Sequence, residues 1–349
     1  MKKIIAAAVA AAVIAPVSVM AAGPVLYGKI QMSVNYLDNN GSGDAKYNEA
    51  SLNSNHSRIG VKGSEDLGNG MKVGYLIEWA VDMDGDTSKS GAGDLAMRNR
   101  AVTLSGDWGT VLAGQWDTPV KTLSRKIDMF GERLGDTRNL NTGGVVVDAR
   151  TANTVAYVTP NMNGFSSTIA YVFDVRKSGA DDSDGDAFSV NGIYNNGPLL
   201  LGAGYENISD GVFGANAEDQ SVWRLVGSYK IGDFKILGGY TDVTDGAGID
   251  GHDTYIWSAG GSYAMGNNTI KLQYTDRSEY DDAKNTGADQ WAIGLDHAMS
   301  KRTTVYVEYA TLSNDDNSTS RSWNTMGNDA RAVAGEDTDG FGVGIVHKF

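Results

Sequence analysis

Residues 26–36 read LYGKIQMSVNY, and this stretch decides the fold class. Its residues fall into two alternating sets, one mostly apolar and one polar. The apolar set is Leu26, Gly28, Ile30, Met32, Val34 and Tyr36. The other set is Tyr27, Lys29, Gln31, Ser33 and Asn35. Because successive side chains of a β-strand point to opposite faces, this period of two predicts a strand of about ten residues with one apolar face.

The same alternation recurs along the rest of the chain. Apolar residues with a spacing of two occur at Met71–Trp79, Trp223–Ile231, Ile270–Tyr274 and Phe341–Phe349. A helix would instead repeat its apolar residues every three or four positions. These stretches therefore predict an all-β protein built from half-buried strands.

Turn-forming segments separate the strands, and short and long segments alternate. The short turns are Leu67–Gly70, Asp107–Gly109, Pro160–Gly164, Asn195–Pro198, Ile231–Asp233, Met265–Asn268 and Met299–Arg302. The long polar segments are 38–56, 83–96, 117–149, 175–186, 207–219, 243–253, 279–287 and 312–337. Seven short and eight long connections predict sixteen strands, with both chain termini on the side of the short turns.

Composition excludes several classes of protein. The 349 residues include no cysteine, which removes disulfides, thiolate catalysis and cysteine-ligated zinc. A formal net charge of -14 argues against a nucleic-acid partner, since such a partner requires a clustered basic surface. The four histidines lie in separate segments without the spacing of metal ligands. We expect no enzyme activity, no metal and no cofactor.

The N-terminal residues predict export. Lys2 and Lys3 precede an apolar run that ends in the small residues Ala21 and Ala22, as in a secretory signal peptide. Residues 1–21 are predicted to be cleaved, so that the mature chain starts at Ala22, with Gly23 as the alternative, and residues 22–349 form one domain. A membrane anchor is the competing interpretation, but the run is short and contains Pro16.

Sixteen amphipathic strands fit either a soluble sandwich or propeller or a closed barrel in a membrane. The face opposite the apolar one decides between them, because it carries charge that suits a wet lumen. Charged residues on that face are Lys29, Lys62, Lys72, Glu78, Arg98, Arg224, Lys271 and Glu308. Aromatic residues near strand ends, which suit membrane interfaces, are Tyr36, Trp79, Tyr157, Tyr274, Tyr309 and Phe349. These features favour a sixteen-stranded antiparallel transmembrane β-barrel.

From Val25 to Phe349 the sequence resembles the general porins of Gram-negative outer membranes, which are homotrimers of sixteen-stranded barrels. The blocks that carry the resemblance are Leu26–Lys29, Ser57–Gly63, Glu65–Gly70, Gly106–Val111, Ser300–Thr304 and His347–Phe349. The resemblance implies an outer-membrane location reached through the periplasm, contact with lipid and lipopolysaccharide, and passage of small hydrophilic solutes and ions. It also implies that the terminal Phe349 is the signal for the outer-membrane assembly machinery. The simpler interpretation is that Phe349 is one of the aromatic residues that lie at the membrane interface.

The resemblance further implies a pore constriction made by the third long segment, 117–149, folded into the barrel. Asp128–Thr137 resembles the acidic loop motif of the family, which places Asp128, Glu132 and Asp136 at the constriction. Opposite them, the wall residues of the family match Lys29, Arg58, Arg98 and Arg150. The chain departs from the family where Gly131–Gly135 replaces the usual Pro-Glu-Phe-Gly-Gly, and Lys121, Arg125 and Lys126 add positive charge.

The fourth predicted strand suggests how the barrel assembles. If Arg98 points inward, a regular strand turns Asn99, Ala101, Thr103 and Ser105 outward. Lipid would reject this small and polar face, whereas a neighbouring subunit would accept it. A one-residue bulge that shifts the register is the alternative.

The sequence thus predicts a non-specific passive diffusion channel that filters solutes by size, polarity and charge at a ring of wall arginines and loop carboxylates. Two alternatives are a solute-specific channel, which would call for a file of inward aromatic residues, and a surface adhesin or receptor that acts through its loops. The preference for cations or anions stays open, because wall and loop mix both signs of charge.

Overall fold

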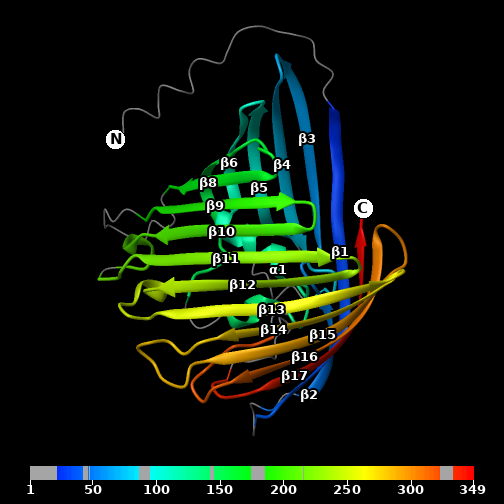
Figure 1. Cartoon of the computed structure of the whole chain (residues 1–349), viewed down its shortest axis with the longest axis vertical. Helices are drawn as coiled ribbons and strands as arrows, with labels where there is room; N and C mark the ends of the chain where they lie inside the picture. Colours follow the sequence, from blue (N-terminus) through cyan, green and yellow to red (C-terminus); the bar gives the residue numbers. More distant parts are fainter. Residues whose placement is uncertain are drawn as a thin grey trace.

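The structure is a computed structural model that describes residues 22–41, 46, 48–85, 95–141, 145–173, 185–214, 216–322 and 333–349 (Figure 1). The proposed signal peptide, residues 1–21, lies outside the described residues. The strands are β1 (Ala22–Asn39), β2 (Asn48–Ser54), β3 (Arg58–Gly68), β4 (Met71–Val81), β5 (Leu95–Gly106), β6 (Gly109–Asp117), β7 (Arg150–Val158), β8 (Phe165–Val172), β9 (Ala187–Asn196), β10 (Leu199–Ile208), β11 (Gln220–Ile231), β12 (Phe234–Thr244), β13 (Thr254–Met265), β14 (Asn268–Arg277), β15 (Ala288–Ala298), β16 (Thr303–Asn314) and β17 (Thr338–Lys348). The helices are α1 (Pro119–Ile127), η4 (Thr137–Leu140), η5 (Asp210–Val212) and η6 (Gly246–Gly248).

The strands form one closed antiparallel barrel. Each strand from β3 onward pairs with the next one in the sequence, and β17 pairs with β1 from Lys29 opposite Lys348 to Asn39 opposite Thr338. The other edge of β1 pairs first with β2 and then with β3. The strands β2 and β3 therefore form a single wall strand, and the barrel has sixteen wall strands, as the sequence predicts.

The break inside that second wall strand corrects the predicted first loop. Residues 48–54, which the sequence analysis assigned to a long connection at 38–56, form β2. Near the break, His56 adopts a left-handed backbone with φ 52°, while Asn55 donates its N–H to the Gln31 carbonyl at 2.8 Å. The polar composition of residues 48–54 suggested a loop, but alternate side chains of this strand such as Asn53 are buried toward the wet lumen, where polar residues belong, while Leu52 is exposed on the exterior.

The two faces of the wall have opposite polarity. Side chains of Lys29, Gln31, Ser33 and Asn35 are buried inside the barrel, whereas Val34 on the alternate face is 54% exposed. The same holds far along the sequence, where Arg224 is buried and its neighbours Trp223 and Leu225 are exposed. Apolar side chains therefore face the exterior, and polar side chains face the lumen, as the alternation predicts.

The strand β5 differs from the predicted regular strand. Its register with β4 shifts between Ile77, which pairs with Arg100, and Trp79, which pairs with Met97. This bulge inserts an extra residue, so that Ala101 packs on the lumenal residue Leu112 while Val102 is exposed on the exterior. The predicted outward face of Asn99, Ala101, Thr103 and Ser105 is therefore wrong, and the bulge that was the alternative is present.

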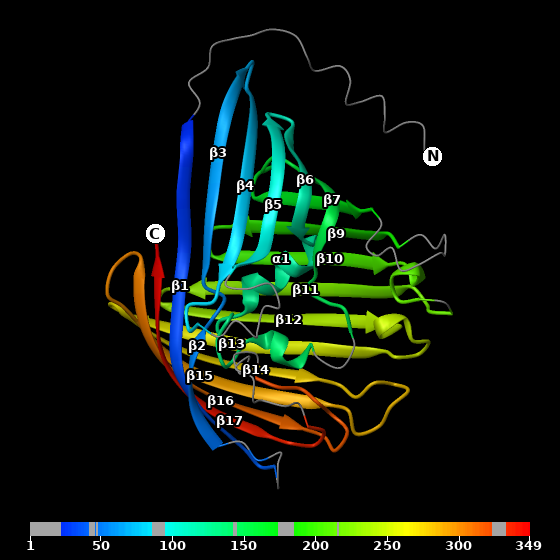
Figure 2. The same ribbon diagram turned by 180° about the vertical axis from the view of Figure 1, so that it is seen from behind.

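The segment between β6 and β7, residues 118–149, is the third loop and it folds into the barrel. Its helix α1 lies inside the ring of strands against β9, β10, β11 and β12 (Figure 2). The loop thus places side chains in the middle of the lumen. No helix within the described ranges is long and apolar enough to cross a membrane.

Candidate functional site

The helix α1 begins the third loop because its sequence contains start signals. Thr118 is the N-cap, and its hydroxyl oxygen accepts the N–H of Lys121 at 3.4 Å. Pro119 occupies the first turn, where no N–H is needed. Val120, Leu123 and Ile127 form the buried stripe of the helix and pack on the lumenal wall.

Inward glycines on that wall make room for the helix. A Cβ atom at Gly204 of β10 would lie 2.8 Å from Leu123 Cδ1, and one at Gly239 of β12 would overlap Ile127 Cδ1. A larger residue at either position would displace the side chain of Leu123 or Ile127. The glycines therefore allow the buried stripe of α1 to pack closely on the wall.

The tip of the loop is fastened to the wall opposite α1. Phe130 and Leu134 are fully buried in a cluster with Leu37, Ala292 and Ala310. Arg133 donates from Nη1 to Asp296 Oδ1 at 2.6 Å, and its guanidinium lies 3.9 Å from the ring centroid of Tyr306. These contacts hold the loop as a fixed part of the barrel.

The predicted loop residue Glu132 reaches the wall itself. Its carboxylate forms ion pairs with the wall residues Lys29 and Arg58, the latter at 2.9 Å. Burial alone would raise the pKa of Glu132, but Lys29 and Arg58 outweigh it and hold the pKa well below the usual range. Glu132 is therefore a permanent anion that neutralises part of the wall.

The other two predicted loop acids, Asp128 and Asp136, lie inside the loop. Their side chains are 1% and 0% exposed. Asp136 accepts the N–H of Glu132 at 2.6 Å and pairs with Arg138, so it holds the loop backbone in shape. Burial would raise the pKa of Asp136, but Arg138 and Arg125 outweigh burial and lower it. For Asp128, burial and then the negative charge of Asp136 raise the pKa to about 7.

The predicted wall arginines are held by acids that the sequence analysis did not assign to the constriction. Arg98 donates from Nε to Glu78 Oε1 at 2.6 Å, and Arg150 Nε lies 3.0 Å from Asp117 Oδ1. Glu78 also accepts a hydrogen bond from Tyr27 at 3.2 Å. The antiparallel pairing of β4 with β5 could have indicated that Glu78 lies beside an arginine of β5. The exact partners could not be predicted, because they depend on the register between the folded strands.

The loop and wall together enclose an aperture of about 570 Å³. Six cationic side chains line it: Arg58, Arg98, Lys121, Arg125, Arg138 and Arg150. Four carboxylates line it as well: Glu78, Asp117, Glu132 and Asp148. Three of the cations belong to the third loop, so the loop is a source of positive as well as negative charge. The ring carries an excess of positive charge although the whole chain is acidic.

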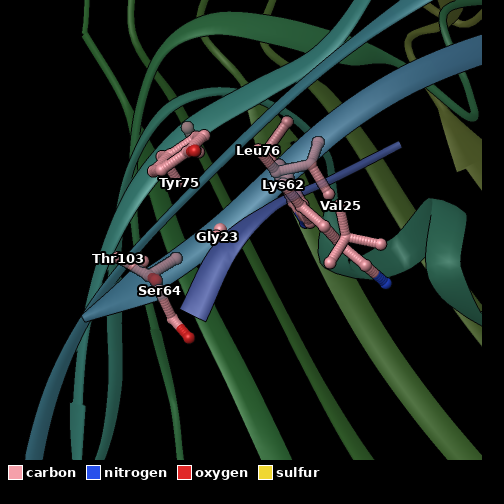
Figure 3. A pocket seen from close by; sticks show the side chains of 11 residues that line it. Gly23, Val25, Lys62, Ser64, Tyr75, Leu76 and Thr103 are labelled. Carbon is pink, nitrogen blue, oxygen red and sulfur yellow. The ribbon is translucent and has the colours of Figure 1, made fainter. Parts of the chain in front are cut away.

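A second hollow of about 380 Å³ lies toward the side of the short turns, between β1, β3, β4 and β5 (Figure 3). Lys62 is the charged residue among those that line it, and Lys62 Nζ lies 5.0 Å from the ring centroid of Tyr27. The remaining lining is glycine, small or apolar. The hollow therefore has one positive charge and no cluster of charged groups in its lining.

A closed barrel with an apolar exterior, a polar lumen and an inward loop defines an outer-membrane channel protein. The comparisons with known proteins agree with this class: the sequence model described as Gram-negative porin matches residues 6–317. The chain belongs to the Gram-negative porin family, and it is located in the outer membrane.

Individual relatives and a solved structure extend the likeness along most of the chain. The chain is 32% identical to outer membrane porin protein 32 of Delftia acidovorans, over 93% of each chain. It is 29% identical to a major outer membrane protein P.IB of Neisseria gonorrhoeae, over 66% of this chain and 68% of that protein. The structure of an anion-selective porin from Comamonas acidovorans superposes with a TM-score of 0.78 at 29% identity, covering 94% of this chain and 99% of the other.

Proposed function

We propose that the protein is a non-specific diffusion channel for small hydrophilic solutes and ions, that it works as a homotrimer, and that it favours anions. The observation that carries the proposal is the aperture, where six cations face four carboxylates. Guanidinium groups stay charged at any physiological pH, so this excess is permanent. The likeness to the anion-selective porin from Comamonas acidovorans supports the same preference.

The aperture filters through charge and size. In a narrow passage with protein walls, fixed charges act on a passing ion more strongly than in bulk water. A polar solute can replace water against the arginines, whereas an apolar solute gains nothing in exchange for the water that it displaces. At Glu132 the third loop contacts the wall directly, so its carboxylate neutralises positive charge of the wall there. The open path for solutes runs beside the arginines of the aperture.

Conductance across a planar lipid bilayer tests this function. We expect large steps of current that do not saturate as the salt concentration rises, and a reversal potential in a potassium chloride gradient that shows a preference for chloride. Saturation by a single sugar would indicate the solute-specific channel instead. A folded trimer without conductance would indicate the adhesin or receptor.

Neutralising Glu132 should strengthen the preference for anions. In Glu132→Gln, the charges of Lys29 and Arg58 lose their carboxylate partner, so the positive excess of the ring grows by one. The matched change Asp128→Asn should have a smaller effect, because that side chain is buried inside the loop. Reversal potentials that are the same for Glu132→Gln and the unaltered protein would show that Glu132 lies away from the narrowest point.

Acidification should also strengthen the preference for anions. Asp128 has a raised pKa of about 7, so its carboxyl is charged above that pH and neutral below it. Protonation removes a negative charge 3.6 Å from Arg125, which lines the aperture. Reversal potentials measured on either side of pH 7 should therefore shift toward the chloride potential as the pH falls. The shift should vanish in Asp128→Asn; if it persists there, another group titrates.

A further inference from the structure

A side cavity of about 290 Å³ lies at the base of the third loop, beside the aperture. Its floor is the lumenal face of β8, β9 and β10, which pair side by side (Figure 1). Both ends of the third loop line the cavity and meet there, since Thr118 donates its N–H to the Ala149 carbonyl at 3.2 Å. The helix η5 and the residue after it complete the lining with Val212 and Phe213. Segments far apart in the sequence therefore enclose the cavity.

Hydrogen bonds from a single buried side chain hold one edge of the cavity. Gln220, which is fully buried, accepts the N–H of Val146 at 3.1 Å and the N–H of Ala247 at 2.9 Å. Its Nε2 donates to the Val146 carbonyl at 2.7 Å. Val146 and Ala247 both line the cavity, so Gln220 ties the third loop to the connection after β12. A cavity that is already formed costs little ordering when a small molecule enters it.

Most of the lining is apolar, and the charged residues in it are one acid and one base. The apolar part includes Val146, Val172, Ile208, Val212 and Phe213. The charged residues are Glu206 of β10 and Arg150 of β7. The strands β8 and β9 lie between β7 and β10, so three strand spacings of about 4.8 Å put the two backbones roughly 14 Å apart. The two charges therefore approach the cavity from different sides.

Glu206 is buried without the partners that a carboxylate needs. The residue is 1% exposed, and within the described part of the chain neither of its carboxylate oxygens has a hydrogen bond. The hydroxyl groups of Thr118 and Ser189 lie beside Glu206, but they are not in hydrogen-bonding geometry with it. The nearby Arg224 is paired with Asp148 instead. Because a buried acceptor without a donor is costly, Glu206 requires a donor from within the cavity.

Arg150 has donors for a carboxylate on the other side of the cavity. Its closest contacts are made by Nε, which donates to Asn99 Oδ1 at 2.6 Å and lies 3.0 Å from Asp117 Oδ1. Its two terminal nitrogens donate no hydrogen bond to any residue that the structure describes. Terminal guanidinium nitrogens bind a carboxylate through two parallel hydrogen bonds. The cavity thus combines a site for a cation, a site for a carboxylate and an apolar space.

We propose that this cavity binds a zwitterionic amino acid with an apolar side chain. The ammonium group of the ligand donates to Glu206, its carboxylate accepts from Arg150, and its side chain packs among the apolar residues of the lining. A ligand with only one of these charges leaves either Glu206 or Arg150 without a partner, which favours an amino acid over an alkylamine or a fatty acid. The volume is near the lower limit for small-molecule pockets and suits a ligand of the size of leucine. The site goes beyond the proposed channel, because diffusion through the aperture requires no bound solute.

Equilibrium dialysis of radioactive leucine against the folded protein in detergent tests the site. We expect saturable binding of one leucine per chain. Isopentylamine lacks the carboxylate and isocaproate lacks the ammonium group, so each should compete at least about tenfold less well than unlabelled leucine. Equal competition by either compound overturns the assignment to amino acids. Absence of saturable binding overturns the site itself.

Three variants separate the proposed contacts from a loss of folding, which heating in dodecyl sulfate monitors. Glu206→Gln removes the charge and should weaken leucine binding by at least about tenfold. Ala187→Leu keeps both charges but fills the cavity, which Ala187 lines, and should abolish binding. The matched control Glu218→Gln makes the same chemical change at an exposed position before β11 and should bind leucine like the unaltered protein. An affinity that Glu206→Gln leaves unchanged, or that Glu218→Gln lowers equally, overturns the role of Glu206.

Conductance across a bilayer, recorded for the same samples, separates this inference from the proposed channel. Because Arg150 lines both the cavity and the aperture, leucine should lower the chloride current of the unaltered channel but not that of Ala187→Leu. Leucine that binds without changing the current overturns the contact with Arg150. A conducting channel that binds no leucine contradicts the site alone, whereas a folded protein that binds leucine without conducting contradicts the channel alone.

Discussion

Replacing Arg98 and Arg150 together with glutamine should abolish the preference for anions. The ring would then hold four cations and four carboxylates, since Glu78 and Asp117 lose their partners and keep their charges. A fixed charge about 4 Å from a passing ion contributes about 1 kcal/mol in bulk water and about 4 kcal/mol at the effective dielectric constant of a protein surface. We therefore expect the ratio of chloride to potassium permeability to fall by about tenfold or more. Reversal potentials in a potassium chloride gradient measure this ratio.

The control for this double variant removes positive charge far from the ring. Lys230 lies at the end of β11 on an exposed surface, and Lys301 lies in the exposed turn before β16. The double change Lys230→Gln with Lys301→Gln alters the net charge by the same amount. If this control shifts the reversal potential as strongly as the ring variant, then net charge and not the ring sets the preference.

The sequence was sufficient for the architecture because the barrel repeats a single rule. Away from the bulges, the wall strands obey the period of two, so stretches such as residues 26–36 suffice to assign inside and outside. The alternation of short and long connections gives the number of strands and places both termini on the side of the short turns. These features depend on neighbours in the sequence, which is why they could be predicted.

The sequence offered the bulge in β5 only as an alternative, because a bulge depends on pairing between strands. Alternation from Arg98 to Ser105 is compatible with two registers, and the shift against β4 decides which face each residue joins. The consequence is large, since it moves Arg100 to the exterior and Ala101 to the lumen. In a sequence, such a register shift is indicated by a polar residue at the centre of an outward face.

The contacts of the predicted loop acids depend on the folded structure more than on their residue types. The resemblance assigned Asp128, Glu132 and Asp136 one common role, whereas the structure places Glu132 against the wall and the other two inside the loop. Inward glycines such as Gly204 look like weak strand positions in the sequence, and their purpose appears only when Leu123 packs on them. Contacts between residues far apart in the chain therefore define the aperture.

The substitution Phe130→Ala should release the third loop and widen the pore. Phe130 is fully buried between Leu37, Leu134, Ala292 and Ala310, and Lys271 Nζ lies 4.6 Å from its ring centroid. Loss of a buried phenylalanine side chain costs about 3–5 kcal/mol. The hydrogen bonds between the sixteen wall strands do not depend on this cluster. The loss of free energy should therefore weaken the docking of the third loop. We expect larger and noisier single-channel currents, and entry of larger sugars in liposome swelling.

The control for Phe130→Ala is the same change on the outer wall. Phe165 begins β8, faces the exterior at 41% exposure and lies away from the third loop. Phe165→Ala removes the same atoms and should leave conductance and the size limit for sugars unchanged. Heating in dodecyl sulfate checks that both barrels stay folded. A Phe130→Ala channel with unaltered conductance would mean that the ion pairs of Arg133 with Asp296 and of Glu132 with Arg58 hold the loop without its apolar anchor.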